Sequence, residues 1–409
     1  MAVAYISKVP SGTSTDGAAF ATGAANEVMA TVAARMIVRF RRLLSSFITA
    51  TMYAIPDSTS VCRQRDTRAR PDDAKQLTAP AWTTATRRAF WLLDSCLRAA
   101  TVEVMRTRSL RGLSVIRTLE NSPHSSHTVP NDPYGSHFIG VMNILFPSGE
   151  RGFIRVISQA RSLVGDTELQ QRIDEFIQQE AQHARAHSIL VQHSEYRGRY
   201  TRLATRLSEF FVRVMFGGKK THLHSLLVFR TATVAAIENL TAEMGRWIFE
   251  DARFAELECD AVTVELLKWH GAEEVVHRAV AFDTLVALSP RWHRLLRSAA
   301  MLLWMPVFFA TWIICAQALL IDDKTVSKSV LTPARVQRSS RSGAMPGIPM
   351  LTRRMIPFFA KAFHPDSVVS PKTDAACVAH LAQPTSEYKQ QRSQEQRNLY
   401  PYYSPLAFA

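Results

Sequence analysis

Apolar residues recur at helical spacing in four stretches of the middle of the chain, and polar residues fill the positions between them. These stretches span residues 146–164, 166–193, 230–251 and 261–288. A repeat near 3.6 residues is typical of helices that bury one face, and no Asn-Gly turn of the kind that joins β-strands separates the stretches. The second stretch offers two N-caps, Asp166, or Thr167 with Gln170 three residues later. The pattern predicts an all-α fold.

The rest of the chain divides by composition. Residues 27–55 have the pattern of a basic amphipathic helix that lies on a membrane surface or packs on the helical bundle, and packing is favoured. We predict five regions: a disordered N-terminus over 1–26, a basic helical extension over 27–105 with a linker at 56–80, a helical bundle over 106–290, a hydrophobic helix with a basic segment over 291–365, and a tail over 366–409.

An uncharged run from Ser298 to Ile321 predicts a long hydrophobic helix after the bundle. The run is long enough to span a bilayer. However, three arginines precede it, a basic tract without acidic residues follows it, and Pro306 interrupts it. A helix that is buried in the protein or dips into a membrane is therefore favoured over a transmembrane span.

Composition narrows the class of protein. Of 409 residues, 47% are hydrophobic and 21% are charged, which excludes a wholly disordered chain. The five cysteines include no C-x-x-C pair, which excludes a zinc ribbon, argues against a disulfide scaffold and suits a reducing compartment. The formal charge of +14 favours anionic partners. No nucleic-acid recognition motif accompanies this charge, so we expect no nucleic-acid partner.

The strongest chemical signal is a repeated pattern of glutamate and histidine. The second and fourth stretches each carry Glu-x-x-His, whose two side chains project from one helix face. The first and third stretches each carry a glutamate in an apolar setting. Four-helix bundles that hold two iron or manganese ions use this set of residues. The predicted metal ligands are Glu150, Glu180, His183, Glu238, Glu274 and His277. Glu150 follows Pro147 and Gly149, which predicts a position near the start of a helix.

Further ionisable residues lie beside these six. His187 and His270 are either additional ligands or hydrogen-bonding partners of ligands, and the second role is favoured. Glu273 competes with Glu274, which we prefer because its spacing to His277 matches that of the first pair. Glu243, beyond Glu238 on the third stretch, is expected to be a surface acid or a neighbour of the ligands.

Three segments also resemble a known family: NDPYGSHFIGVMNILFPSGERGF, FIQQEAQHARAH and WHGAEEVVHRAVAFD. They are similar to the bacterial predicted metal-dependent hydrolases, a family related to the ferritin-like superfamily, and the likeness covers roughly residues 105 to 365. The resemblance implies a ferritin-like four-helix bundle with a dimetal-carboxylate site, here with extra N-terminal helices. It also implies that the recurrent acidic and histidine positions of the family fall on Glu150, Glu180, His183, His187, His270, Glu273, Glu274 and His277.

Two reactions suit such a site. One is the O2-dependent oxidation of an apolar small molecule by two iron ions, and the other is the hydrolysis of an ester, amide or phosphoester by two divalent ions. Site chemistry favours oxidation, whereas the family name implies hydrolysis; a non-enzymatic, ferritin-like metal-binding protein is a third alternative. The apolar substrate is expected from aromatic residues near the predicted ligands, namely Phe146, Trp247, Phe249, Trp269 and Phe282.

The expected cofactors are two divalent metal ions, with iron favoured and manganese or zinc as alternatives. The expected partners are an apolar small-molecule substrate, an electron-donor protein if the reaction is oxidative, and a membrane surface. We expect a cytoplasmic location, with membrane association through residues 298–321.

Overall fold

The computed structural model describes residues 110–122, 127–193, 198–217, 221–326 and 330–383. The chain divides into two compact units, Met1–Gln76 and Leu77–Ala409, and all of the described residues lie in the second unit. The disordered segment, helices and linker predicted over 1–105 lie outside the described residues, as does the predicted tail from residue 384 onward.

Every regular element among the described residues is a helix, which confirms the predicted all-α class. A first helix covers 110–121. It is followed by α3 (Pro133–Arg161), α4 (Thr167–His193), α5 (Arg199–Phe216), α6 (His224–Glu250), α7 (Ala261–His277), α8 (Val280–Leu288), α9 (His293–Asp322), α10 (Pro333–Ser342), α11 (Ile348–Met355), the 3-10 turns η2 (Ile356–Phe359) and η3 (Pro365–Ser367), and α12 (Pro371–Leu381).

Polar side chains mark the beginnings of the helices that carry the site. The carboxylate of Asp132 accepts a hydrogen bond from the Gly135 amide at 2.9 Å, and Pro133 occupies the first turn of α3, where no amide hydrogen is needed. At α4, the Asp166 carboxylate accepts from the Glu168 amide at 2.9 Å. Of the two candidate caps, the structure therefore uses Asp166.

The path of the chain differs from the predicted segments in three places. Helix α3 begins at Pro133 instead of residue 146 and contains Pro147, because burial along the helix outweighs the local cost of a proline. Helix α5 lies between α4 and α6, where no segment was predicted. The fourth predicted segment is split into α7 and α8 near Arg278, whose buried guanidinium donates to the Val275 carbonyl and to the Asp374 carboxylate.

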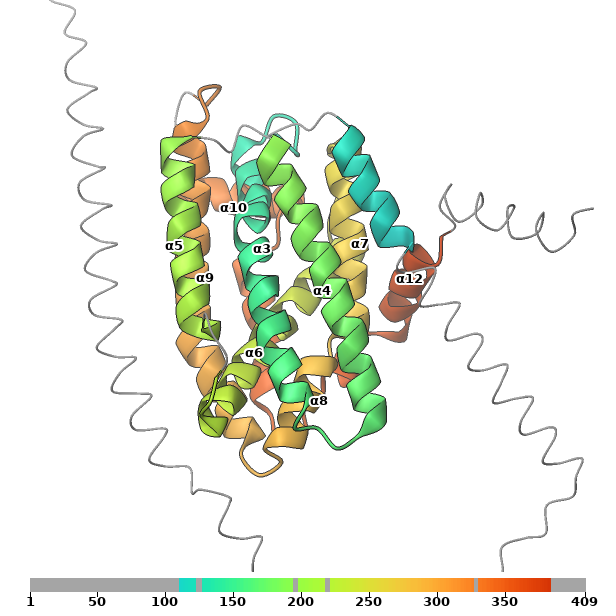
Figure 1. Ribbon diagram of the computed structural model, residues 1–409. Helices are drawn as coiled ribbons and strands as arrows, with labels where there is room; N and C mark the ends of the chain where they lie inside the picture. The colour runs from blue at the N-terminus through green and yellow to red at the C-terminus, as the bar shows by residue number, and fades with distance from the viewer. Residues whose placement is uncertain (1–109, 123–126, 194–197, 218–220, 327–329, 384–409) are drawn as a thin grey trace, which may run out of the picture. The chain divides into compact units, whose positions relative to one another are not determined.

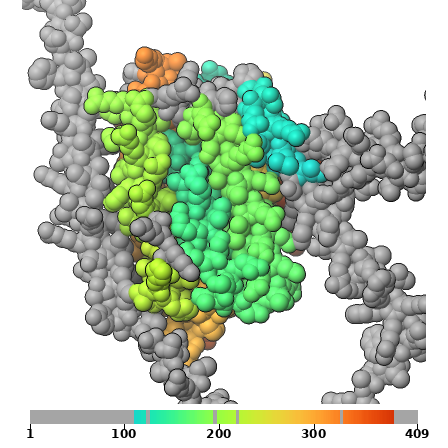
Figure 2. All heavy atoms as spheres, viewed as in Figure 1, coloured from blue at the N-terminus to red at the C-terminus, as the bar shows by residue number. Residues whose placement is uncertain are grey.

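Four helices surround the site. Helix α3 packs against α4 and α6, and α7 packs against α6 and α4. Helices α5 and α9 lie side by side and pack on α3, and α9 also contacts α6 (Figure 1). On the other side α12 packs on α7. Atoms of α3, α4 and α5 cover the face of the molecule seen in Figure 2.

The end of α9 is fastened by two aspartates. Asp322 Oδ2 accepts hydrogen bonds from the amide and the hydroxyl of Thr201 at 2.7 and 2.8 Å, which joins α9 to the start of α5. Asp323 Oδ2 lies 2.6 Å from Nε2 of both His127 and His137. Burial alone would raise the pKa of Asp323, but its hydrogen bonds outweigh burial and hold that pKa well below its ordinary value.

Helix α9 contains the predicted hydrophobic run. By length and composition it could cross a membrane, and 44% of its most apolar 18-residue window is buried inside the protein. Its inner face includes Trp312, whose indole N–H donates to the Phe138 carbonyl at 3.0 Å. Its outer face includes Leu302 and Ile313, which are 68% and 52% exposed. A half-buried surface helix has the same composition, so the membrane association and the cytoplasmic location stay predictions.

Helices α6 and α7 approach each other most closely at two glycines. A Cβ atom on Gly271 would lie 3.0 Å from the Cα of Gly245, and one on Gly245 would collide with the Gly271 carbonyl. Backbones this close leave no room for a side chain. Within about one turn of these glycines, the Thr241 hydroxyl donates to Glu274 Oε2 at 2.7 Å. The glycine contact therefore sets the spacing of α6 and α7 beside the site.

We expect Gly245→Ala to lower the free energy of unfolding by roughly 3 kcal/mol, because the new methyl group meets backbone and not a movable side chain. Thermal unfolding should then begin roughly 6 to 12 °C earlier. The matched control is Gly165→Ala in the exposed loop before α4, where the added Cβ meets no atom within 4 Å. Equal unfolding temperatures for the two variants would contradict the proposed close contact.

Candidate metal centre

The six residues predicted as ligands lie together inside the protein. Each is at most 5% exposed, and they come from four helices: α3 supplies Glu150, α4 supplies Glu180 and His183, α6 supplies Glu238, and α7 supplies Glu274 and His277. Nε2 of His277 lies 3.5 Å from Glu180 Oε1, 3.4 Å from Glu238 Oε2 and 3.3 Å from Glu274 Oε2. The helices thus bring side chains that are far apart in sequence to one buried point.

The donor atoms form overlapping groups, within each of which all atoms lie within 4.8 Å of one another. One group contains Glu180, Glu238, Glu274 and His277, a second contains Glu150, Glu180 and His183, and a third contains His183, His270 and Glu274. A fourth group contains Glu150, His187 and His270, and Glu180 and Glu274 each share one group with His183 and another with His277. Each group has the residue types and spacing that could hold a metal ion.

Glu150 lies in the middle of its helix, so the expected position near a helix start was wrong. The proline and glycine before it suggested a helix start, but α3 continues through both of them. The mid-helix position turns Glu150 toward the other helices, and its Oε1 lies 3.7 Å from His270 Nε2. Glu150 is 3% exposed.

Two polar side chains hold the histidines of the Glu-x-x-His pairs from behind. Glu273 Oε2 lies 2.8 Å from Nε2 of His183, and Gln179 Oε1 lies 3.1 Å from Nδ1 of His277. These contacts leave Nδ1 of His183 and Nε2 of His277 facing the carboxylates. Glu273 thus contacts the outer nitrogen of a histidine, while Glu274 faces the cluster.

The other two histidines form a chain that ends at Glu274. Nδ1 of His187 lies 2.8 Å from Asn143 Oδ1, and Nε2 of His187 lies 2.7 Å from Nδ1 of His270. Nε2 of His270 lies 2.8 Å from Glu274 Oε1. Burial and the neighbouring His183 lower the pKa of His270 to about 4, and burial with His270 lowers that of His187 well below its ordinary value. Both rings are therefore neutral near pH 7.

Sequence reasoning missed several of these contacts. Gln179, Asn143 and Thr241 carry no motif, and only their place in the fold brings them to the site. Glu243 is not a surface acid: it is 3% exposed and pairs with Arg246 at 3.4 Å. A separate group of His127, His137 and Asp323 also has spacing that could hold a metal ion, and it too was not predicted.

Burial and mutual repulsion disturb the acids of the cluster. Burial, with repulsion from neighbouring carboxylates, raises the pKa of Glu150, Glu180 and Glu238. Burial would also raise the pKa of Glu274, but attraction to His277 and His270 and hydrogen bonds with them together outweigh burial and lower that pKa well below the ordinary value. Conversely, burial would lower the pKa of His277, but Glu274 and Glu238 raise it to about 10.

The residues present fit a bound cation. Among the described residues, eight buried side-chain atoms of the cluster have no hydrogen-bond partner: both carboxylate oxygens of Glu150, Glu180 and Glu238, Nδ1 of His183 and Nε2 of His277. Buried polar atoms without partners cost free energy and are rare in native proteins. Carboxylate oxygens and imidazole nitrogens are ligands of divalent transition metals. A divalent cation among these atoms would satisfy them.

Comparison with family models gives one match, described as predicted metal-dependent hydrolase, over residues 116–368. The chain belongs to this family. The match covers more than half of the chain and includes all six predicted ligands. Comparisons with curated proteins and with solved structures found no match. The family prediction is confirmed, while the bacterial distribution and the ferritin-like relation stay predictions.

The family and the buried groups together support a divalent metal as the cofactor of this family member. The family description also fits hydrolysis better than the oxidation that site chemistry favours.

We expect the metal-free protein to lose stability as the pH rises from about 7 to 9. An acid or a histidine whose pKa is raised on folding contributes stability that is fully present below its unfolded pKa, about 4.3 or 6.5, and is lost as the pH rises through its folded pKa. Glu150, Glu238 and His277 act in this direction, whereas His187 and His270, whose pKa values are lowered, act in the opposite direction only below about pH 6.5. Added Mn(II) or Zn(II) should reverse the loss, by about 2.7 kcal/mol at a concentration of 100 Kd.

Thermal unfolding of chelator-treated protein across this pH range, with and without metal, measures the effect. A metal-induced shift in unfolding temperature that is the same at pH 7 and pH 9 would contradict the proton release expected when these groups bind metal.

We expect Glu238→Gln to lower metal affinity by at least about 10-fold, because an amide cannot supply the charge of a carboxylate ligand. Glu243→Gln is the matched control: Glu243 is a buried glutamate on the same helix, but it pairs with arginines and lies outside the cluster. Metal content per chain, measured by atomic emission after dialysis, should fall in the first variant alone. Equal metal content in both variants would show that Glu238 is not a metal ligand.

Proposed function

We propose that this member of the metal-dependent hydrolase family binds two divalent cations among α3, α4, α6 and α7 and hydrolyses an ester, amide or phosphoester there. The observation that carries the proposal is the set of eight buried, unpartnered oxygen and nitrogen atoms that face one another. Such a set costs free energy in a folded protein unless protons or cations complete it. The family description supports hydrolysis as the reaction.

The groups of donor atoms suggest how two cations would be held. Glu238 and His277 would serve one ion, and Glu150 and His183 would serve the other. Glu180 and Glu274, which each share one group with His277 and another with His183, would contact both. Each of the two ions would then have one glutamate and one histidine of its own, the arrangement by which ferritin-like bundles hold two metals. On this basis we propose a ferritin-like relation for these four helices.

The chain's other polar groups would hold the ligands in place. Glu273 and Gln179 fix the ring orientation of His183 and His277 through their outer nitrogens, as carboxylates and amides commonly do behind metal-binding histidines. The Thr241 hydroxyl donates to Glu274 and limits its rotation. Loss of these contacts would weaken metal binding without removing a ligand.

His270 would serve as a third histidine ligand. A neutral His187 that donates from Nδ1 to Asn143 Oδ1 must accept at Nε2, so the proton between the two rings lies on Nδ1 of His270. Nε2 of His270 then carries a lone pair directed toward Glu274 and Glu150. This assignment makes His187 a partner of a ligand and His270 a ligand.

When bound, two divalent cations would lower the pKa of a water molecule and polarise the carbonyl or phosphoryl oxygen of a substrate. Hydrolysis adds one water across the bond, so that hydroxyl goes to carbon or phosphorus and the proton goes to the leaving group. Glu150 lines the adjoining pocket and lies at the cluster, which suits it to face the reacting group. The surrounding apolar side chains exclude bulk water from these charges.

A second candidate function is the O2-dependent oxidation of an apolar molecule by two iron ions, for which an electron-donor protein would be needed. The observation that favours it is the donor set, since four carboxylates and two or three histidines suit iron. The two functions share one site and differ in their need for oxygen.

The proposed function is tested with metal-free protein that is loaded with Mn(II), Zn(II) or Fe(II) under argon and assayed against nitrophenyl esters, anilides and phosphoesters. We expect hydrolysis without oxygen, and a loss of more than about 100-fold in kcat/KM in Glu180→Gln. Glu243→Gln, the same control as above, should retain activity because it lies outside the cluster.

Oxygen consumption by the Fe(II)-loaded protein, with no hydrolysis under any metal, would overturn the hydrolytic proposal in favour of oxidation. Hydrolysis that persists in Glu180→Gln would show that the activity does not come from this site.

A further inference from the structure

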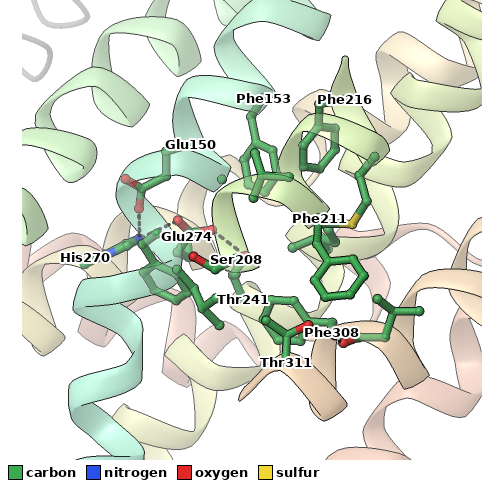
Figure 3. A pocket seen from close by; sticks show the side chains of 17 residues that line it. Glu150, Phe153, Ser208, Phe211, Phe216, Thr241, His270, Glu274, Phe308 and Thr311 are labelled. Atoms are coloured by element: carbon green, nitrogen blue, oxygen red, sulfur yellow. Dashed lines mark hydrogen bonds and ion pairs between the residues drawn. The ribbon is translucent and has the colours of Figure 1, made fainter. Parts of the chain in front are cut away.

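A partly open cavity adjoins one side of the candidate metal centre. It has a volume of about 40 Å3 and is lined by residues of α3, α5, α6, α7 and α9. Glu150, His270 and Glu274 lie together at one end of it, and Phe153, Phe211, Phe216 and Phe308 lie at the other (Figure 3). A mostly apolar lining with a few convergent polar groups is typical of sites that bind small molecules. The space therefore connects the reacting end of the site to an apolar chamber.

The chamber offers a ligand almost no hydrogen-bond donor away from the metal centre. The Ser208 hydroxyl donates to the Thr205 carbonyl at 2.8 Å, and the Thr311 hydroxyl donates to the Val307 carbonyl at 2.8 Å. The Thr241 hydroxyl is likewise used, by Glu274. No lysine, arginine or aspartate lines the chamber, and its glutamates and its histidine belong to the metal centre. A polar group placed between α5 and α9 would lose its water without replacement.

The residues that make the chamber apolar differ from those predicted. Of the five aromatic residues that were expected to surround the substrate, only Phe146 lines the chamber. Trp269 packs against His183, Phe282 against Phe363, and Phe249 against His380, while Trp247 lines a separate small cavity. About half of the lining, eight residues, instead comes from α5 and α9, the two helices that lie outside α3.

We propose that the chamber binds the hydrocarbon chain of an amphiphilic substrate, whose ester, amide or phosphoester group lies at the Glu150 end. This substrate class is an acyl or alkyl chain with one hydrolysable head group. The assignment of the head group rests on the proposed function, whereas the assignment of the chain does not. Sugars, nucleotides and polar peptides do not fit, because each carries polar groups along its whole length. For an acyl ester, water adds to the carbonyl carbon, the C–O bond to the alcohol breaks, and the alcohol oxygen takes the proton.

Chain binding can be measured apart from catalysis. We would titrate n-alkanols from butanol to decanol into metal-free and metal-loaded protein by calorimetry, because an alkanol has the chain but no group that hydrolyses. Affinity should increase by up to about fourfold for each methylene that enters the chamber, and then level off when the chamber is full. Binding should show a negative heat-capacity change. The same trend is expected with and without metal.

A pair of variants on α5 locates the binding. Val212→Trp places a large side chain in the chamber lining and should weaken octanol binding by at least 10-fold. Val214→Trp is the matched control, since Val214 is also a half-buried valine of α5 but does not line the chamber. Thermal unfolding and metal content of both variants show whether each has folded. If Val212→Trp does not fold, Thr311→Val should retain or tighten octanol binding, because it removes a hydroxyl from an apolar wall.

Affinity that does not change with chain length, tighter binding of naphthol than of every alkanol, or equal octanol binding in the two tryptophan variants would overturn the proposal. Weaker octanol binding in Thr311→Val would also overturn it. If no substrate is hydrolysed but alkanols bind as expected, the proposed function is wrong while the chamber still binds a hydrocarbon chain. The failure of one proposal can therefore be distinguished from the failure of the other.

Discussion

Four carboxylates that share one buried point are the constraint on which the rest of this structure depends. Glu150, Glu180, Glu238 and Glu274 are each at most 3% exposed. Removing one ionised carboxylate from water costs several kcal/mol, and like charges at short range add repulsion. Two or three histidines can offset only part of this charge. The raised pKa values, the unpartnered oxygens and the polar groups behind the histidines all follow from the need for positive charge among them.

The helices and the ligand pattern could be predicted because both are local in sequence. A period of 3.6 residues identifies a buried helix face, and a spacing of three places Glu180 beside His183 wherever the helix packs. The single glutamates of the first and third stretches indicate metal ligands only in combination with this repeated pattern. The position of Glu150 was predicted wrongly for a local reason too, since Pro147 normally ends a helix, and only the packing of α3 explains why it does not do so here.

What could not be predicted depends on contacts between distant segments. No pattern links Gln179 to His277 or Asn143 to His187, because a glutamine or asparagine on a helix is usually exposed. The chamber lining is a similar case: Phe211 and Phe308 lie almost 100 residues apart and meet only because α5 and α9 pack side by side. The uncharged run in α9 suggested a membrane, but one of its faces closes a chamber beside the metal centre.

The meeting of α6 and α7 at Gly245 and Gly271 has a consequence for the unfolding of the protein. Because main chain packs against main chain there, no flexible side chain lies between the two helices that could adjust to a change in their spacing. Glu238 and Glu274 are carried by these same two helices. Separation of these two helices would therefore part Glu238 from Glu274, so that loss of the glycine contact and loss of the ligands carried by α6 and α7 would occur together.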